Sequence, residues 1–328
     1  MDFFLESNGS AGRVSYASAE FQGLRRWVRL YDWPRHRAAA LISRIGAEAK
    51  RKGEKIQMIH HWIDALPQGI IVGNQGLLAM SFSGVDGVTS GELLNRREYD
   101  AAMEKSHNLF IQAKKIHDEW EQIYIRATDF QKLNRLADEM NQQLFADHYL
   151  PKAGKRKDRF FGSGTAAGAK DYVETITEGL PQRYFIKGRP GTGKSTFLRK
   201  IAEYALSRGF DTEIYHCSFD PSSLDMVVVR ERGLCIFDST APHEYEPERA
   251  GDERLDFYRL AVDPDTDQTY AAALQECAVG YREKIQEATQ WLRLAKNSLE
   301  ETDQRLDELL DQEKINRYGN EIIKEMLN

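Results

Sequence analysis

The sequence predicts an α/β protein made of two similar halves, each with a parallel sheet flanked by helices and followed by a long, coiled-coil-like helical segment. Three observations support this prediction: a glycine-rich loop between a β-prone segment and an amphipathic helix, an internal repeat, and two long segments with helical periodicity. We expect domains at 1–150 and 158–328, because a polar, basic stretch at 151–157 is typical of a solvated linker.

The glycine-rich loop lies in the second half. It consists of the consecutive residues Gly188, Arg189, Pro190, Gly191, Thr192, Gly193, Lys194 and Ser195, followed by Thr196. This order matches G-x-x-x-x-G-K-[ST], the Walker A pattern of phosphate-binding loops, whose backbone N–H groups wrap a polyphosphate. Residues 183–186 before it are β-prone, and 197–206 after it are apolar at helical spacing. The motif therefore has the strand–loop–helix context that it requires.

This loop predicts that ATP and Mg²⁺ bind to the second half. The loop glycines would shape the phosphate cradle: Gly188, Gly191 and Gly193. Lys194 would contact the β- and γ-phosphates, and Thr196 would assist at the α-phosphate. ATP is favoured as the nucleotide because the chain has no guanine-specific N-K-x-D motif.

A candidate magnesium site follows from the apolar run 234–238, which ends in Asp238. A buried parallel strand has this composition, and its terminal carboxylate would lie beside the loop. We therefore expect Ser195 and Asp238 to hold the metal and Lys194 and Asp238 to be catalytic, with Asp220 and Asp225 as the next acids to consider. Ser239 follows Asp238 where many ATPases have a glutamate. This predicts slow hydrolysis, or transfer to a bound acceptor.

An internal repeat aligns the first half with the second at a shift of 156 positions, without gaps over about sixty residues. The matching positions include three residues of each copy: Gly53, His60 and Asp64 against Gly209, His216 and Asp220. Further on the shift is 171, as Trp120 against Trp291 shows. The second copy has therefore gained about fifteen residues, which we place within 241–267.

The first copy lacks the phosphate-loop chemistry. Four of its residues stand opposite Gly188, Gly191, Gly193 and Lys194, namely Asp32, Arg35, Arg37 and Ala38. A β-carbon at each former glycine blocks the wrapped loop, and no lysine remains. We expect a structural partner and one nucleotide per chain. The alternative is that the two arginines still meet an anion.

Other polar residues near the loop have simpler explanations. His216 could be a general base, but the first copy retains His60 there, which favours a structural role. An arginine that closes over a phosphate is common in phosphoryl transfer; the candidates are Arg230, Arg232, Arg249 and Arg254, although a surface role is simpler for each. Residues 240–245 would cross the mouth of the site and contact an acceptor or partner.

Long helical segments end both copies. Apolar or small residues recur every seven positions in 274–309: Ala278, Ile285, Leu292, Leu299 and Leu306. A second stripe at an offset of three completes a heptad pattern. The first copy has a poorer version between 116 and 130. We expect the two segments to pack on each other.

Composition excludes several classes of protein. A net charge of −6 argues against a nucleic-acid-binding surface. Three scattered cysteines are too few for a disulfide framework or a zinc site, and they indicate a reducing compartment. No signal-like segment or 18-residue apolar run is present, so we expect no membrane association and a cytoplasmic location.

Residues 184–196, 215–221 and 237–245 resemble an uncharacterised bacterial P-loop ATPase family built from two tandem P-loop cores. The resemblance covers most of the chain after about Arg159, and before that it rests on the repeat. It implies ATP binding in the cytosol. Both copies usually carry a phosphate loop in that family, so this chain departs from it.

The favoured function is a slow Mg²⁺-dependent ATPase whose nucleotide state changes how the two copies and their helices, or a partner, pack. One alternative is a small-molecule or nucleotide kinase, with 216–225 and the inserted loop forming the acceptor pocket. The other is a non-hydrolysing, ATP-dependent scaffold.

Overall fold

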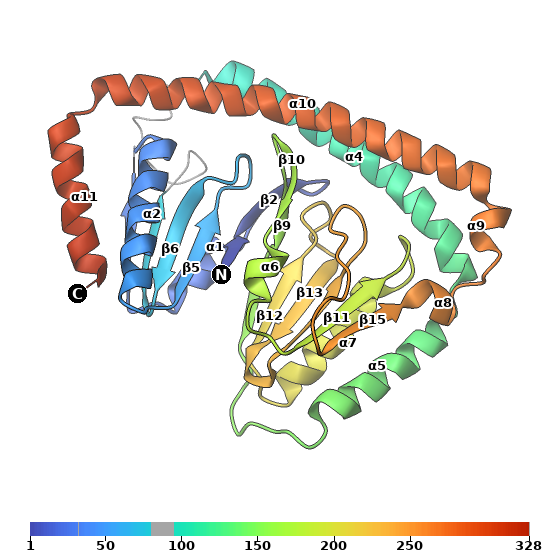
Figure 1. Cartoon of the computed structure of the whole chain (residues 1–328). Coiled ribbons are helices and arrows are strands. Elements are labelled where there is room, and N and C mark those ends of the chain that lie inside the picture. The colour runs from blue at the N-terminus through green and yellow to red at the C-terminus, as the bar shows by residue number, and fades with distance from the viewer. Residues whose placement is uncertain (32, 80–94, 328) are drawn as a thin grey trace.

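The computed structural model describes residues 1–31, 33–79 and 95–327 and shows a mixed α/β protein with two sheets (Figure 1). The first sheet has five strands in the order β1-β5-β6-β7-β4. Their bounds are Asp2–Phe4 for β1, Ile56–His60 for β5, Pro67–Val72 for β6, Gln75–Ala79 for β7 and Arg26–Leu30 for β4. Helix α2 (Arg35–Arg51) covers one face and α1 (Ala17–Gln22) precedes β4.

The second sheet has six strands in the order β15-β11-β14-β13-β12-β8. Counted from β8, its first five strands correspond to β1, β5, β6, β7 and β4 of the first sheet, and β15 is the additional strand. Their bounds are Asp252–Asp256 for β15, Gln182–Lys187 for β11, Leu234–Asp238 for β14, Leu224–Val229 for β13, Thr212–His216 for β12 and Arg156–Arg159 for β8. Equivalent strand pairs have the same directions in both sheets: parallel, antiparallel, antiparallel and parallel. The extra strand β15 lies within 241–267, where the sequence places the insertion, whereas the first copy's residues 80–94 lie outside the described part.

The expected parallel sheet of each half is confirmed only in part, because both sheets are mixed. Strand β14 is parallel to β11 but antiparallel to β13, and β13 is antiparallel to β12. The cause is the length of the connections: residues 217–223 join β12 to β13, and a short turn at Arg230–Arg232 joins β13 to β14. A parallel crossover needs about a dozen residues, so these strands can only form hairpins.

The remaining helices connect and cover the sheets. In the second half they are α6 (Val173–Ile176), α7 (Lys194–Ser207), α8 (Phe257–Ala261) and α9 (Thr266–Thr269). Two long helices, α4 (Arg96–Ala127) and α10 (Ala271–Leu309), lead into α5 (Phe130–Phe145) and α11 (Gln312–Leu327). Each half of the chain also has a small hairpin directly after its first strand. In the first half β2 (Glu6–Gly9) pairs with β3 (Gly12–Ser15), and in the second half β9 (Gly162–Thr165) pairs with β10 (Gly168–Asp171). Arg156 and Lys157, expected in the linker, begin strand β8 instead.

The two long helices pack on each other along their lengths, as expected. Lys105 Nζ of α4 lies 4.1 Å from the centre of the Trp291 ring, while Ile116 contacts Gly280. Positions later in α4 therefore meet positions earlier in α10, and the pair is antiparallel. Within the described residues, no helix combines the length and apolar character needed to span a membrane.

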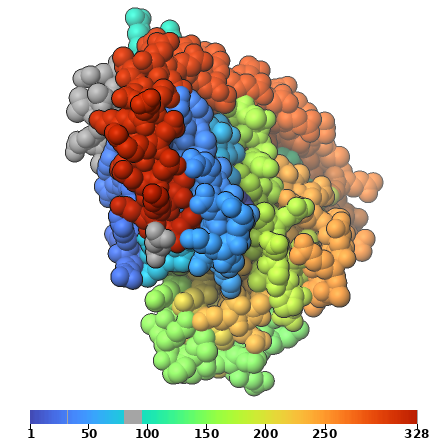
Figure 2. Space-filling view, turned by 60° about the vertical axis from the view of Figure 1, so that its left-hand side comes forward, coloured from blue at the N-terminus to red at the C-terminus, as the bar shows by residue number. Residues whose placement is uncertain are grey.

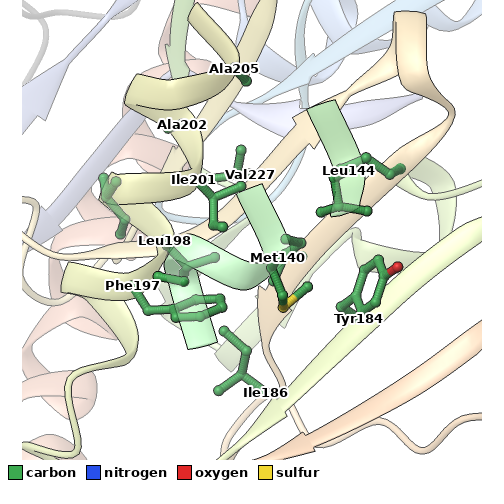
Figure 3. Close-up of a cluster of buried hydrophobic side chains, with 14 of the residues drawn as sticks. Met140, Leu144, Tyr184, Ile186, Phe197, Leu198, Ile201, Ala202, Ala205 and Val227 are labelled. Atoms are coloured by element: carbon green, nitrogen blue, oxygen red, sulfur yellow. The ribbon is translucent and has the colours of Figure 1, made fainter. Parts of the chain in front are cut away.

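The terminal helix of each half packs on the core of the other half. Helix α5 follows α4 but packs on α7 of the second half, where Met140 and Leu144 face Phe197, Leu198 and Ile201 (Figure 3). Helix α11 follows α10 but covers α2 of the first half (Figure 2). This exchange ties the halves together, because neither core is complete without a helix that the other half's long helix delivers.

Contacts at positions that match in the repeat join the two halves in both directions. Phe4 and Phe160, which match in the repeat, exchange two backbone hydrogen bonds of 2.9 Å each. The N–H of Ser10 donates to Phe219 O at 2.9 Å, and the equivalent N–H of Ala166 donates to Ile63 O at 2.8 Å. A shared apolar core lies between the facing sheets, with Phe3, Ile59, Phe185 and Phe237 among its residues.

Candidate functional site

The glycine-rich loop joins β11 to α7, as expected from the motif. Gly191 and Gly193 have φ angles of 78° and 81°, a region that residues with a side chain rarely adopt. Gly193 caps the first turn of α7, so the backbone N–H groups at this helix start point toward the loop's interior. Thr192 donates a hydrogen bond from Oγ1 to Arg189 O at 2.7 Å, which holds the loop in its turn.

The loop lysine and the strand acid lie close together. Lys194 Nζ is 3.5 Å from Asp238 Oδ2 and donates to Arg189 O at 2.9 Å. Asp238 Oδ1 accepts a hydrogen bond from Thr240 Oγ1 at 2.7 Å. Ser195 Oγ accepts the N–H of Leu224 at 2.9 Å. The structure thus brings the ends of β11 and β14, the start of β13 and the start of α7 to one place.

A second carboxyl group adjoins Asp238. Met226 pairs with Phe237 in the β13–β14 ladder, so the next position along the two strands sets Asp225 beside Asp238. Burial, and then the charge of Asp238, raise the pKa of the Asp225 carboxyl to about 7. Two neighbouring carboxyl groups and a serine hydroxyl form a set of oxygen ligands that suits Mg²⁺. These residues therefore fit the expected metal, and Asp225 is a better second acid than Asp220, which pairs with Lys114 at 3.4 Å.

A cavity of about 1330 Å³ opens over the loop. The whole loop lines it, together with Thr196, Asp225 and Asp238. The opposite walls come from α4 and α10 and include Phe110, His117, Trp120, Glu121, Tyr281 and Ile285. Concave sites with mostly apolar walls and a few convergent polar groups are typical of small-molecule binding.

Helix α4 touches the loop directly, which the sequence does not reveal. A β-carbon on Gly191 would lie 2.5 Å from Glu121 O, and one on Gly193 would lie 3.1 Å from the Phe130 ring at the start of α5. Burial raises the pKa of the Glu121 carboxyl and lowers that of His117. Ligand atoms of His117, Asp118 and Glu121 lie within 4.8 Å of one another, and only the four-residue spacing of His117 and Glu121 hints at this from sequence.

The corresponding loop of the first half is filled by carboxylates. The N–H of Arg35 donates to Asp303 Oδ1 at 2.8 Å, and its Nε donates to Oδ2 at 2.9 Å. Arg35 also pairs with Asp64, and Arg37 pairs with Asp307. The two arginines do meet anions, but those anions are side chains of this chain. Asp32, opposite Gly188, lies outside the described residues.

His216 has the structural role that the repeat predicts. Its Nδ1 lies 2.7 Å from Pro221 O and its Nε2 lies 2.7 Å from Asp158 Oδ1. His60 makes the equivalent contacts with Ala65 O and Asp2 Oδ1, at 2.9 and 3.0 Å. Both ring nitrogens are engaged, and His216 is not among the residues that line the cavity.

The four candidate arginines differ in whether they line the cavity. Arg230 pairs with Glu213, and Arg232 donates to Leu144 O, so both are engaged away from the cavity. Arg249 is also absent from the cavity lining, whereas Arg254 lines it and lies 3.3 Å from Asp256. Arg189 of the loop pairs with Asp267 at 2.9 Å.

Residues 240–244 line the cavity, so this segment does reach the mouth of the site. His243 Nδ1 lies 2.7 Å from Asp171 Oδ2, and Tyr245 donates its hydroxyl to Asp171 Oδ1 at 2.5 Å.

No protein-family model, curated protein or solved structure matches the chain.

Proposed function

We propose that the second half binds ATP·Mg²⁺ and hydrolyses ATP slowly, as a P-loop nucleoside triphosphatase. The two halves would be tandem P-loop-like cores, of which the first has lost its loop. One observation carries the proposal: a G-x-x-x-x-G-K-S loop between β11 and α7, with Gly191 and Gly193 at positive φ, opens into a cavity that also holds Lys194 and Asp238. We also propose that the protein acts in the cytosol, as the resemblance to the P-loop ATPase family implies.

Each residue has a defined task in this proposal. The backbone N–H groups of the loop and of the first turn of α7 bind phosphate oxygens. When ATP binds, Lys194 gives up its hydrogen bond to Arg189 O and donates to the β- and γ-phosphates instead. Ser195 and Asp238 hold Mg²⁺, with Asp225 as the adjacent carboxylate. When bound, the metal neutralises charge that develops on the phosphate oxygens.

The long helices support a coupling between nucleotide state and packing. Helix α4 contacts the loop at Gly191, while α10 lines the cavity with Tyr281 and reaches the first half's loop with Asp303. Tyr281 and Asp303 are about 33 Å apart along one continuous helix, at 1.5 Å per residue. A shift of α10 at the cavity therefore reaches the contact with the first half.

A binding titration with matched variants tests the proposal. Lys194→Ala removes a charge-assisted hydrogen bond of roughly 1.5–3 kcal/mol, so ATP affinity falls at least about tenfold. Lys200→Ala is the control, because Lys200 lies on the same helix but outside the cavity lining. Equal ATP affinity in the two folded variants would contradict the proposal.

A kinase is the second candidate, and the size of the cavity favours it. At about 1330 Å³ the cavity exceeds the roughly 300–1,000 Å³ of ordinary small-molecule sites, which leaves room beside a nucleotide. Products from labelled ATP, formed with and without a metabolite pool, separate the functions. Free phosphate alone supports the ATPase, and a labelled metabolite supports the kinase. Neither product, with binding retained, supports an ATP-dependent scaffold.

A further inference from the structure

The position after Asp238 offers no base for activating water. Ser239 stands there, and its hydroxyl is fully engaged with Tyr245. Ser239 Oγ donates to Tyr245 O at 2.8 Å and accepts the N–H of Tyr245 at 2.9 Å. A group that takes the proton from an attacking water must therefore come from another part of the cavity.

His243 has the orientation that such a group requires. Its Nδ1 lies 2.7 Å from Asp171 Oδ2, so Nδ1 donates its proton to this carboxylate, and in the neutral ring the lone pair is on Nε2. Nε2 has no hydrogen-bond partner among the described residues, and this atom is accessible to solvent and not buried. His243 itself lines the cavity. His216 and His60, in contrast, have both nitrogens engaged.

Neighbouring contacts fix the imidazole ring in place. The Phe161 ring meets it edge-on, with ring centres 4.9 Å apart. Asp171 is itself held, because Tyr245 donates its hydroxyl to the second carboxylate oxygen at 2.5 Å. Side-chain positions that are set by packing and by outer hydrogen bonds are what a proton-transfer site needs.

The same loop ties His243 to the candidate metal site. The N–H of His243 donates to Thr240 O at 2.9 Å, and Thr240 Oγ1 donates to Asp238 Oδ1 at 2.7 Å. His243, Thr240, Asp225 and Asp238 all line the same cavity. His243 and the candidate metal site therefore belong to one cavity and are linked through Thr240.

We propose that His243 is the general base that activates water for attack on the γ-phosphate, and that Asp171 is its positioning residue. This inference rests on the proposed ATPase function. Nε2 takes a proton from water as the water oxygen bonds to the γ-phosphorus. The bond from that phosphorus to the β–γ bridging oxygen breaks, and ADP leaves with the electron pair. His243 then returns the proton to solvent, while Asp171 stays ionised and stabilises the imidazolium.

Three variants test this role: His243→Gln, His243→Gly and Asp171→Asn. Loss of a general base lowers kcat by about 100-fold or more, while the dissociation constant for ATP changes by less than about twofold. Added imidazole restores part of kcat to His243→Gly, because it occupies the vacated space and takes the proton. Added imidazole does not restore kcat to Asp171→Asn, because the His243 ring still occupies its place in that variant. His148→Gly, at an exposed histidine, is the control and is unaffected by imidazole.

The outcomes separate this inference from the function on which it rests. Lys194-dependent hydrolysis that continues at the parent rate in His243→Gln overturns the inference alone. A folded His243→Gly chain whose lost activity imidazole leaves unchanged also overturns it, since a structural role would give that result. If His243→Gly does not fold, kcat of His243→Gln decides. An unchanged chain that releases no phosphate from ATP removes both proposals.

Discussion

Asp303 of α10 accepts the backbone N–H of Arg35 at 2.8 Å, at the start of α2. In the second half, Gly191 stands at the position equivalent to Arg35, and the start of α7 faces an open cavity. A carboxylate of the protein thus lies in the first half where the proposed nucleotide phosphates would lie in the second. Helix starts favour anions in both halves, and in the first half a carboxylate of the protein supplies the anion.

The Arg35–Asp303 contact should stabilise the whole molecule. Asp303→Ala removes the acceptor of two hydrogen bonds from a charged residue, which are worth roughly 1.5–3 kcal/mol in unfolding free energy. Glu300→Ala on the same helix removes only an exposed ion pair with Lys296, worth about 0–1 kcal/mol. Urea denaturation of both variants measures the difference, and equal losses would show that the contact is dispensable.

Asp64 should make stability depend on pH in the acid range. Burial alone would raise its pKa, but the hydrogen bond with His61 and the charges of His61 and Arg35 lower it to about 2. Because the folded-state value lies below the unfolded value of 3.8, the stabilisation is complete above about pH 4 and is lost as pH falls through 2.

Asp64→Asn should accordingly lose about 2 kcal/mol of unfolding free energy at pH 7 and much less near pH 2. Asp138→Asn, at an exposed position of α5, should lose little at either pH. A loss at Asp64 that stays constant between pH 7 and pH 2 would contradict the ion-pair explanation.

A β-carbon at Gly191 should disturb the contact between the loop and α4. Gly191→Ala imposes a strained φ of 78° and sets the new atom 2.5 Å from Glu121 O. Gly179→Ala is a matched control, with a φ of 74° and nothing within 4 Å of its β-carbon. Both variants carry backbone strain of about 1–2 kcal/mol, but only Gly191→Ala should lose ATP affinity. Equal ATP affinities would argue against a role for this contact.

Asp238→Asn should separate metal binding from nucleotide binding. The variant keeps the loop and Lys194, so ATP without Mg²⁺ binds as before. The part of the affinity that Mg²⁺ adds should fall, and phosphate release should stop, because a carboxamide is a weak magnesium ligand. Turnover at the parent rate would assign the metal to Asp225 instead, and Asp225→Asn tests that directly.

Local elements followed from the sequence more closely than their arrangement did. The strand at 234–238 and the long helix over 274–309 were expected from apolar patterns, which depend only on neighbouring residues. The mixed sheets were missed, although the short connection 217–223 contained the information.

Contacts between distant residues could not be predicted in the same way. Glu121 meets Gly191, Asp171 meets His243, and Asp303 meets Arg35 across 70 or more positions of sequence, each through packing of whole elements. No local pattern encodes such pairs. The sequence therefore predicted a glycine-rich loop between a strand and a helix and a strand that ends in Asp238, while the wall formed by α4, the oriented histidine and the carboxylates in the first half required the structure.

Calorimetric titration of the full chain with ATP and Mg²⁺ tests the central claim most directly, since it counts the sites and locates them. The filled loop of the first half and the open loop of the second predict one ATP per chain, and Lys194→Ala should weaken that single site at least about tenfold. A stoichiometry near two, or undiminished binding by Lys194→Ala, would contradict it.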